Sequence, residues 1–372
     1  MRSGRGRSGE QPLGADVTSP TAGATPSGRA GRLDWVDAAK GISILLVVAH
    51  HVVWFMQRSG QAPTPLLAAN EALASLRMPL FFLASGLFVA GPLAATWRTV
   101  LHKRVALFLY LYAIWTIIRF TFFAALVPPA VDPDDSANPV SLAWALLLPG
   151  PSTWFLYALA VFAVVAKLLR PVPVALQLGA AAVLSALVGA GMLEFGDTRW
   201  AYMARFLFFF LLGCHARRLI ERLADATSLL RVIMATAVCV GAAGAAVMLN
   251  LRSIPPVALI LQCLAVGFGV LFAAWICRYR IGTLLVALGR QTLPIYLIHM
   301  LWLAAMMTGI GQLDLASGAA YALPVVMVPV LAALSLLTHR VLVTVGGRCL
   351  FELPPRLAGD RRRDRDRRRL LA

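Results

Sequence analysis

Ten apolar stretches alternate with more polar connections along the chain. About 20 apolar residues are enough to cross the hydrocarbon core of a bilayer as a helix. In lipid, a helix satisfies its own backbone hydrogen bonds, so each stretch is predicted to be helical. The pattern therefore predicts an all-α, polytopic membrane protein with about ten transmembrane helices, near residues 35–57, 72–90, 104–128, 153–167, 172–192, 200–216, 229–249, 255–277, 283–308 and 318–339.

The composition indicates one membrane domain rather than several soluble ones. Of the 372 residues, 59% are hydrophobic and only 14% are charged, whereas soluble domains carry about 25% charged residues. We expect the membrane domain to cover residues 33–345. A disordered, basic N-terminal tail is expected over 1–32, since this segment is rich in Gly, Ser, Pro and Arg and has no apolar core typical of a secretory signal. A basic cytoplasmic C-terminal tail is expected over 346–372.

Positive charge is distributed unevenly between the two sets of connections. If the N-terminus is cytoplasmic, most of the 34 Lys and Arg residues lie in cytoplasmic segments, and the outer connections carry acids such as Asp132, Asp134 and Glu194. The positive-inside rule predicts this asymmetry and places both termini in the cytoplasm. The expected location is therefore the inner (plasma) membrane, crossed several times.

The net charge of +17 does not indicate a nucleic-acid-binding protein. The arginines flank apolar stretches and fill the two tails, and the chain has no zinc-finger spacing or basic recognition helix. The lipid bilayer is therefore the expected partner. The five cysteines lack CxxC spacing and are interpreted as small apolar residues. With six scattered histidines and few acids in the spans, no metal site is predicted.

The first apolar helix carries titratable side chains, which are unusual within a membrane span. A charged group near the membrane centre costs roughly 2.5–3.5 kcal/mol, so it usually faces a cavity or a partner. Lys40 and His51 are eleven residues apart, which places them on one helix face, about 16 Å apart along the axis. Asp37 lies on nearly the same stripe. His50 points about 100° away and is interpreted as a packed or hydrogen-bonded histidine.

Three arginines lie in the outer halves of other predicted spans. Arg77, Arg119 and Arg205 could extend to the outer headgroups, but together with His51 they favour a polar cavity inside the helices. Ser85 lies near the middle of the helix that carries Arg77, and the adjacent Gly86 permits close packing of helices.

Two further segments combine aromatic and polar residues. Trp154 and Tyr157 open the fourth span, where such residues commonly form an interfacial belt. Tyr296 and His299 are three residues apart, so they share one face of a helix that Pro294 interrupts.

Four segments carry a resemblance to a known family. The basic residue, ten intervening positions and His of "KGISILLVVAHH" resemble the first-helix motif of the integral-membrane acyltransferase family 3, with Lys40 in place of the usual Arg. "RMPLFFLASGLF" is similar to the second-helix segment of that family. "TWFLYAL" and "LGRQTLPIYLIHM" are similar to two later segments. The four occur in the expected order, between about Leu33 and Arg340.

The resemblance implies a membrane O-acyltransferase. It would move an acyl group, commonly acetyl or succinyl, from cytoplasmic acyl-CoA to a hydroxyl of a cell-envelope carbohydrate or glycolipid. Acyl-CoA would be a co-substrate, with no permanently bound cofactor. His51 matches the catalytic position and Lys40 its basic partner, although Lys offers only a point charge where Arg binds anions in a bidentate way. The substrate-binding candidates are Asp37, Arg77, Ser85, Arg119, Trp154, Arg205, Tyr296 and His299.

The residues leave open how His51 would act and whether the protein is an enzyme. His51 could be a general base or could carry the acyl group covalently. The arginines could hold donor phosphates or the thioester oxyanion. The main alternative is a transporter or flippase for a glycan or lipid-linked precursor. It would use the same charged cavity, but it would not require His51 with a basic partner at eleven residues. A sensory or binding protein would normally add a soluble domain, and neither tail is long enough to form one.

Overall fold

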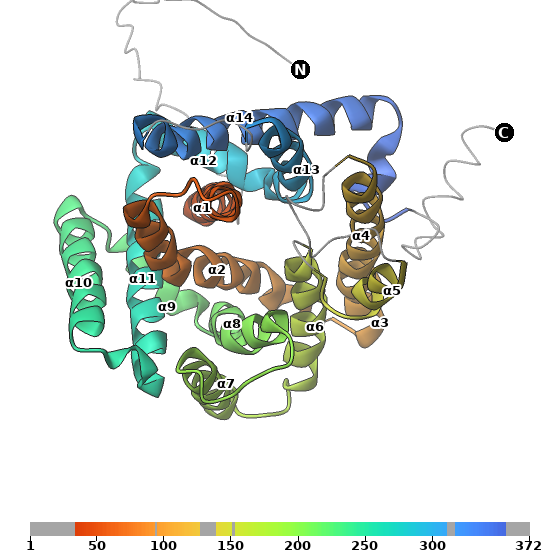
Figure 1. The fold of residues 1–372 in the computed structure, drawn as a ribbon. Helices are drawn as coiled ribbons and strands as arrows, with labels where there is room; N and C mark the ends of the chain where they lie inside the picture. The colour runs from red at the N-terminus through yellow and green to blue at the C-terminus, as the bar shows by residue number, and fades with distance from the viewer. Residues whose placement is uncertain (1–33, 94, 127–138, 151–152, 311–316, 355–372) are drawn as a thin grey trace, which may run out of the picture. The chain divides into compact units, whose positions relative to one another are not determined.

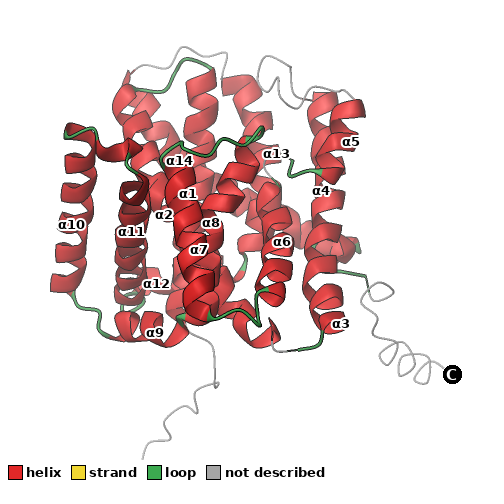
Figure 2. Ribbon diagram, turned by 90° about the horizontal axis from the view of Figure 1, so that it is seen from below, coloured by secondary structure: helices red, strands yellow, loops and turns green. Residues whose placement is uncertain are grey.

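The computed structural model describes residues 34–93, 95–126, 139–150, 153–310 and 317–354. All regular structure in these ranges is helical (Figures 1 and 2). The α-helices are α1 (Asp34–Arg58), α2 (Thr64–Leu93), α3 (Trp97–Val100), α4 (Ala106–Leu126), α5 (Pro139–Leu147), α6 (Trp154–Leu168), α7 (Val174–Gly189), α8 (Thr198–His215), α9 (Arg217–Asp225), α10 (Leu229–Met248), α11 (Pro255–Ile276), α12 (Arg280–Arg290), α13 (Thr292–Ile310) and α14 (Ser317–Thr344). A π-helical turn, η1 (Leu101–Val105), joins α3 to α4, and two short 3-10 helices are η3 (Leu251–Ser253) and η4 (Gly347–Leu350).

Within the described residues, seven helical segments are long and apolar enough to cross a membrane. They are Asp34–Arg58, Thr64–Val89, Trp97–Leu126, Leu229–Met248, Pro255–Ile276, Thr292–Gly309 and Gly318–Thr344. Helices α6 and α7 are apolar but shorter. The all-helical membrane fold is thus confirmed, while the count of ten spans and the cytoplasmic position of both termini stay predictions.

The ninth predicted helix is divided in two. Helix α12 ends at Arg290, Gln291 forms a turn, and α13 begins at Thr292. Pro294 lies in the first turn of α13, where a proline is tolerated because the missing N–H would have no partner within the helix. The interruption gives α12 and α13 separate directions, and both pack against α1.

Helix α1 lies among five other helices (Figure 1). It packs against α2, α11, α12, α13 and α14, and residues such as Ile44, Val48 and Val52 are fully buried. In contrast, α10 packs mainly against α11 and lies beside it in Figures 1 and 2. The middle of α1, which carries His50 and His51, is therefore surrounded by other helices, whereas most of α10 is free to face lipid.

The crossing of α2 and α8 depends on two glycines. A Cβ on Gly86 would overlap the carbonyl oxygen of Phe210, and a Cβ on Gly213 would overlap that of Leu83. The two backbones are therefore in direct contact, which confirms the packing role predicted for Gly86. This crossing places the helix of Arg77 against the helix of Arg205.

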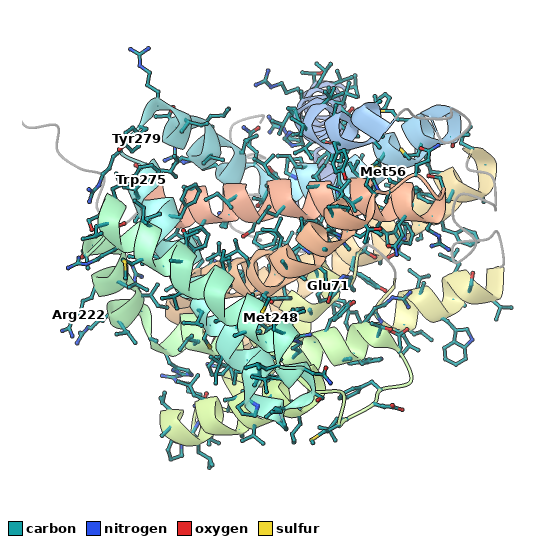
Figure 3. The ribbon with its side chains drawn as sticks, turned by 60° about the vertical axis from the view of Figure 1, so that its left-hand side comes forward. Met56, Glu71, Arg222, Met248, Trp275 and Tyr279 are labelled. Atoms are coloured by element: carbon teal, nitrogen blue, oxygen red, sulfur yellow. The ribbon has the colours of Figure 1, made fainter. Side chains whose placement is uncertain are left out.

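A short amphipathic helix, α9, follows α8. Its Ile220 and Ala224 are buried, whereas Leu219 is exposed and the Arg222 side chain points away from the other helices in Figure 3. Exposed leucine beside arginine suits the boundary between hydrocarbon and headgroups.

Packing continues past residue 345. The indole Nε1 of Trp115 donates to the carbonyl of Leu350, at 2.6 Å, and buried Phe351 contacts both Trp115 and His339. The first residues of the expected C-terminal tail therefore belong to the packed domain. The tail expected over 1–32 and the remainder of the C-terminal tail, 355–372, lie outside the described residues.

Candidate functional site

A cavity of about 200 Å³ lies among α1, α2, α6, α8, α11 and α13. It combines imidazole, guanidinium and amide groups with an aromatic wall. The lining residues are Val47, His50, His51, Ala74, Arg77, Met78, Trp154, Phe155, Tyr202, Arg205, Phe206, Gln262 and Tyr296.

His51 is joined to His299, which is 1% exposed, by a hydrogen bond of 3.1 Å between Nδ1 of His51 and Nε2 of His299. The other ring nitrogen of His299, Nδ1, lies 2.8 Å from the carbonyl oxygen of Ile295. A carbonyl oxygen can only accept, so Nδ1 of His299 must carry a proton.

These contacts determine the tautomer of both rings in their neutral forms. With its proton on Nδ1, His299 has a free lone pair on Nε2 and accepts a hydrogen bond there. His51 must then donate from Nδ1, which leaves Nε2 of His51 unprotonated. His51 lines the cavity, and its unprotonated Nε2 is a basic nitrogen.

His50 has a different partner, Asn70 of α2. Arg77 donates to the side-chain oxygen of Asn70 at 3.0 Å, which orients the amide. Nδ1 of His50 lies 3.1 Å from Nδ2 and 3.3 Å from Oδ1 of the Asn70 side chain. Either tautomer of His50 can therefore form a hydrogen bond with Asn70. The hydrogen-bonded state expected for His50 is observed, and its ring also lines the cavity.

Arg205 is held by Gln262, which is 1% exposed. The amide oxygen of Gln262 faces the guanidinium of Arg205. It accepts hydrogen bonds from Nε of Arg205 at 2.7 Å and from the NH2 group of Arg205 at 2.8 Å. Arg77 donates to the backbone carbonyl of Asn70 as well as to its side chain. Both guanidinium groups are thereby oriented, and the cavity lining contains two arginines and no carboxylate among the described residues.

The aromatic wall comes mainly from α6 and α8. Trp154 contacts Tyr202 and Phe206, with ring centroids 5.6 and 6.4 Å apart. Phe155 meets Tyr296 of α13 edge to face at 5.6 Å. Trp154 therefore lines the cavity rather than serving only as the interfacial belt that such a residue commonly forms.

The structure brings together most of the predicted site residues. His51, Arg77, Trp154, Arg205 and Tyr296 line the cavity. His299 contacts His51 from α13.

Lys40 and Asp37 lie elsewhere. Fully buried Asp37 pairs with Lys40 at 2.9 Å and with Arg290 at 3.3 Å, and Arg290 also binds Asp34. This ion-pair cluster is near the start of α1, about 16 Å along the axis from His51. The spacing of eleven gives the two residues a common face but separates them by three turns, so Lys40 contacts Asp37 and does not line the cavity.

Ser85 also lies outside the cavity lining. Its hydroxyl donates to the Phe81 carbonyl one turn earlier, at 2.8 Å. Such a bond satisfies the hydroxyl within its own helix.

Arg119 lines a different pocket, of about 280 Å³, together with Thr116, Thr153 and Arg199. Its guanidinium lies over the Phe123 ring at 4.5 Å. Arg119 therefore lies outside the lining of the His51 cavity.

Several residues at or beside the cavity were not found from the sequence. Tyr202 and Gln262 line the cavity, and Asn70 contacts both His50 and Arg77. Each is a single polar or aromatic residue in an apolar helix. Gln262 could have been noticed as a polar side chain within a predicted membrane span. Its partner, however, is on another helix and 57 positions away, so spacing along the sequence gives no pairing. Among the described residues, no group of three or more His, Cys, Asp or Glu could hold a metal ion.

A family model described as an acyltransferase domain matches residues 33–339. The chain belongs to this acyltransferase family. The match covers the four segments that carried the resemblance and every residue that lines the cavity.

A more distant similarity exists to the inner membrane protein YcfT of Escherichia coli (strain K12). The two are 27% identical over 153 residues, which is 36% of this chain and 43% of YcfT. The chain thus matches less than half the length of this relative. No solved structure matches the chain.

Proposed function

We propose that this acyltransferase moves an acyl group, acetyl or succinyl, from acyl-CoA to a hydroxyl of a carbohydrate or glycolipid of the cell envelope. The observation that carries the proposal is the hydrogen-bonded pair of His51 and His299, which leaves Nε2 of His51 as a base. A hydroxyl is a poor nucleophile until a base removes its proton. The cavity supplies that base beside two oriented cations, Arg77 and Arg205.

The reaction follows from these groups. Nε2 of His51 takes the proton of the acceptor hydroxyl, and the hydroxyl oxygen attacks the carbonyl carbon of the thioester. Negative charge develops on the carbonyl oxygen, where Arg77 stabilises it. The C–S bond then breaks, and the His51 imidazolium returns its proton to the departing thiolate. The products are the acylated acceptor and CoA with a free thiol.

His299 is a positioning residue in this scheme. It accepts from Nδ1 of His51 and so keeps the proton off Nε2. When His51 becomes an imidazolium, the Nδ1–H bond to His299 strengthens because its donor is then charged.

The aromatic wall gives the acceptor a surface on which to bind. Trp154 and Tyr202 present ring faces or edges to the cavity, and sugar rings present C–H faces that pack on aromatic rings. Their place beside His51 supports a carbohydrate acceptor over a purely aliphatic one.

The decisive experiment measures donor consumption by purified protein in detergent. Acetyl-CoA and succinyl-CoA, each labelled in the acyl group, are supplied with an extract of envelope lipids and glycans. Wild-type protein, His51→Ala and a matched control, His102→Ala at an exposed position, are compared for release of CoA thiol and for label in the acceptor fraction. We expect activity in the wild type and the control and its loss in His51→Ala.

Two results would decide against the proposal. Equal thiol release by His51→Ala would remove His51 as the base. If wild-type protein neither binds nor consumes either donor, transport of a glycan or lipid-linked precursor through the same cavity becomes the better explanation. Label that remains on wild-type protein when acceptor is omitted would instead indicate a covalent acyl-His51 step.

A further inference from the structure

A second, larger hollow adjoins the His51 cavity on its α10–α11 side. This groove measures about 430 Å³ and is formed by α2, α7, α8, α10 and α11. Most of its lining is apolar, for example Ala243, Ala258 and Phe268. Its volume is within the range of about 300–1,000 Å³ typical of sites for small molecules.

The groove and the cavity adjoin each other and share two lining residues. Ala74 of α2 and Arg205 of α8 line both of them. Arg205 therefore stands at the boundary, with an apolar channel on one side and the His51 cavity on the other. Glu71, labelled on α2 in Figure 3, also lines the groove.

Two of the helices around the groove, α10 and α11, face the bilayer. Both α10 and α11 are long and apolar enough to span a membrane. Only 11% of the apolar stretch of α10 is buried within the protein, and only 33% of the apolar stretch of α11 is buried. A hollow between such helices is open to hydrocarbon, so a lipid chain is the molecule that fills it most favourably.

The charge of the cavity indicates what the other end of that lipid carries. Arg77 and Arg205 line the cavity, and its described lining holds no carboxylate. Two guanidinium groups oriented by neutral amides favour an anionic group, and a phosphate matches the planar donor set of arginine.

We propose that the acceptor is an amphiphile that enters from the bilayer. Its apolar chain lies in the groove between α10 and α11, its phosphate lies beside Arg205, and its hydroxyl-bearing head reaches Nε2 of His51. The inference rests on the proposed acyl transfer for the role of the head, but the groove as a lipid site stands independently of it. The chemistry is shared by diacyl phospholipids and by polyprenyl phosphates that carry a saccharide.

The test measures lipid retention by native mass spectrometry in an uncharged detergent without phosphate. Phosphatidylglycerol and a polyprenyl phosphate are titrated separately against wild-type protein, Ala243→Trp and the matched control Ala245→Trp. Ala243 lines the groove, whereas Ala245 is exposed on the same helix. Ala265→Phe, on the α11 side of the groove, is a second blocking variant in case Ala243→Trp folds poorly.

We expect saturable binding to the wild type and the control, and at least about tenfold weaker binding to either blocking variant, because displacing about two methylene groups is enough for that loss. The lipid that binds more tightly identifies the source of the chain. Equal binding to the blocking variants and the wild type would overturn the inference. So would competition by inorganic phosphate alone at equal concentration, since the chain would then contribute nothing.

Acyl transfer separates this inference from the proposed function. A water-soluble glycoside acceptor should be acylated equally by Ala243→Trp and the wild type, while transfer to the amphiphile falls about tenfold in the variant. Wild-type protein that retains lipid but transfers no acyl group would refute the proposed function and leave the lipid groove intact. Wild-type protein that acylates the glycoside but retains neither lipid would refute the groove alone.

Discussion

Replacing His299 with leucine tests the hydrogen-bond chain on which the chemistry depends. Leucine fills most of the space of the imidazole in this buried position but accepts no hydrogen bond. Nδ1–H of His51 then loses the partner that lies 3.1 Å away. Because that bond keeps the His51 proton on Nδ1, its loss allows the proton to move to Nε2, where the base is needed.

The expected size of the effect follows from the hydrogen bond. The net contribution of one hydrogen bond to the free energy is about 0.5–1.5 kcal/mol, and a buried donor left without a partner costs about 1–3 kcal/mol. At 1.4 kcal/mol per factor of ten, the fraction of His51 in the active tautomer falls by about 10- to 100-fold. Removal of the base itself in His51→Ala costs about 10²- to 10⁴-fold, so His299→Leu should have an intermediate rate.

The assay is thiol release from acyl-CoA at saturating acceptor, joined to nitrogen NMR of protein with labelled histidine. In the wild type, Nε2 of His51 should show the shift of an unprotonated nitrogen; in His299→Leu that signal should move towards the protonated value. His299→Gln offers an amide oxygen as acceptor and should recover part of the rate. A wild-type rate in His299→Leu, or a proton on Nε2 in the wild type, would refute the tautomer argument.

Three further changes test the packing and the cavity. Asp37→Ala removes a fully buried carboxylate that pairs with two cations, so it should lower the melting temperature in a thermal unfolding assay by several degrees. Asp34→Ala removes an exposed carboxylate and should change the melting temperature little. Equal shifts in the two variants would show that burial of the carboxylate does not matter there. Gly213→Leu forces apart two helix backbones and should reduce the yield of folded protein, while Gly244→Leu, which meets nothing within 4 Å, should not; normal yield from the former would contradict the close crossing. Trp154→Ala should raise KM for a carbohydrate acceptor about tenfold with a smaller change in kcat, because the lost ring face is a binding surface; an unchanged KM would remove Trp154 from acceptor binding.

The sequence predicted the helical membrane fold because the signal for it is local. Each run of apolar residues is expected to be helical in lipid, because a helix satisfies its own backbone hydrogen bonds without any neighbouring segment. The same reasoning found His51, Arg77 and Arg205, since a charged or titratable group in an apolar helix needs a cavity wherever that helix lies. Gly86 was identified in the same way, from a small residue within a span.

Lys40 shows where local reasoning stopped. Eleven residues give Lys40 and His51 a common direction around the helix axis. Direction alone does not say which neighbour a side chain meets, and Lys40 meets Asp37 and the phenyl ring of Phe88 instead of the cavity. Arg119 was likewise grouped with the other arginines by depth, although its side chain lines a different pocket.

The sequence by itself determined that the fold is helical and membrane-embedded and which apolar helices carry polar groups, because hydrophobic length and the cost of burying charge depend only on the residues of each helix. Only the tertiary structure decided the partners. His51 and His299 are 248 residues apart and meet because α1 and α13 pack side by side. That contact sets which nitrogen of His51 is basic, and no spacing along one helix contains this information.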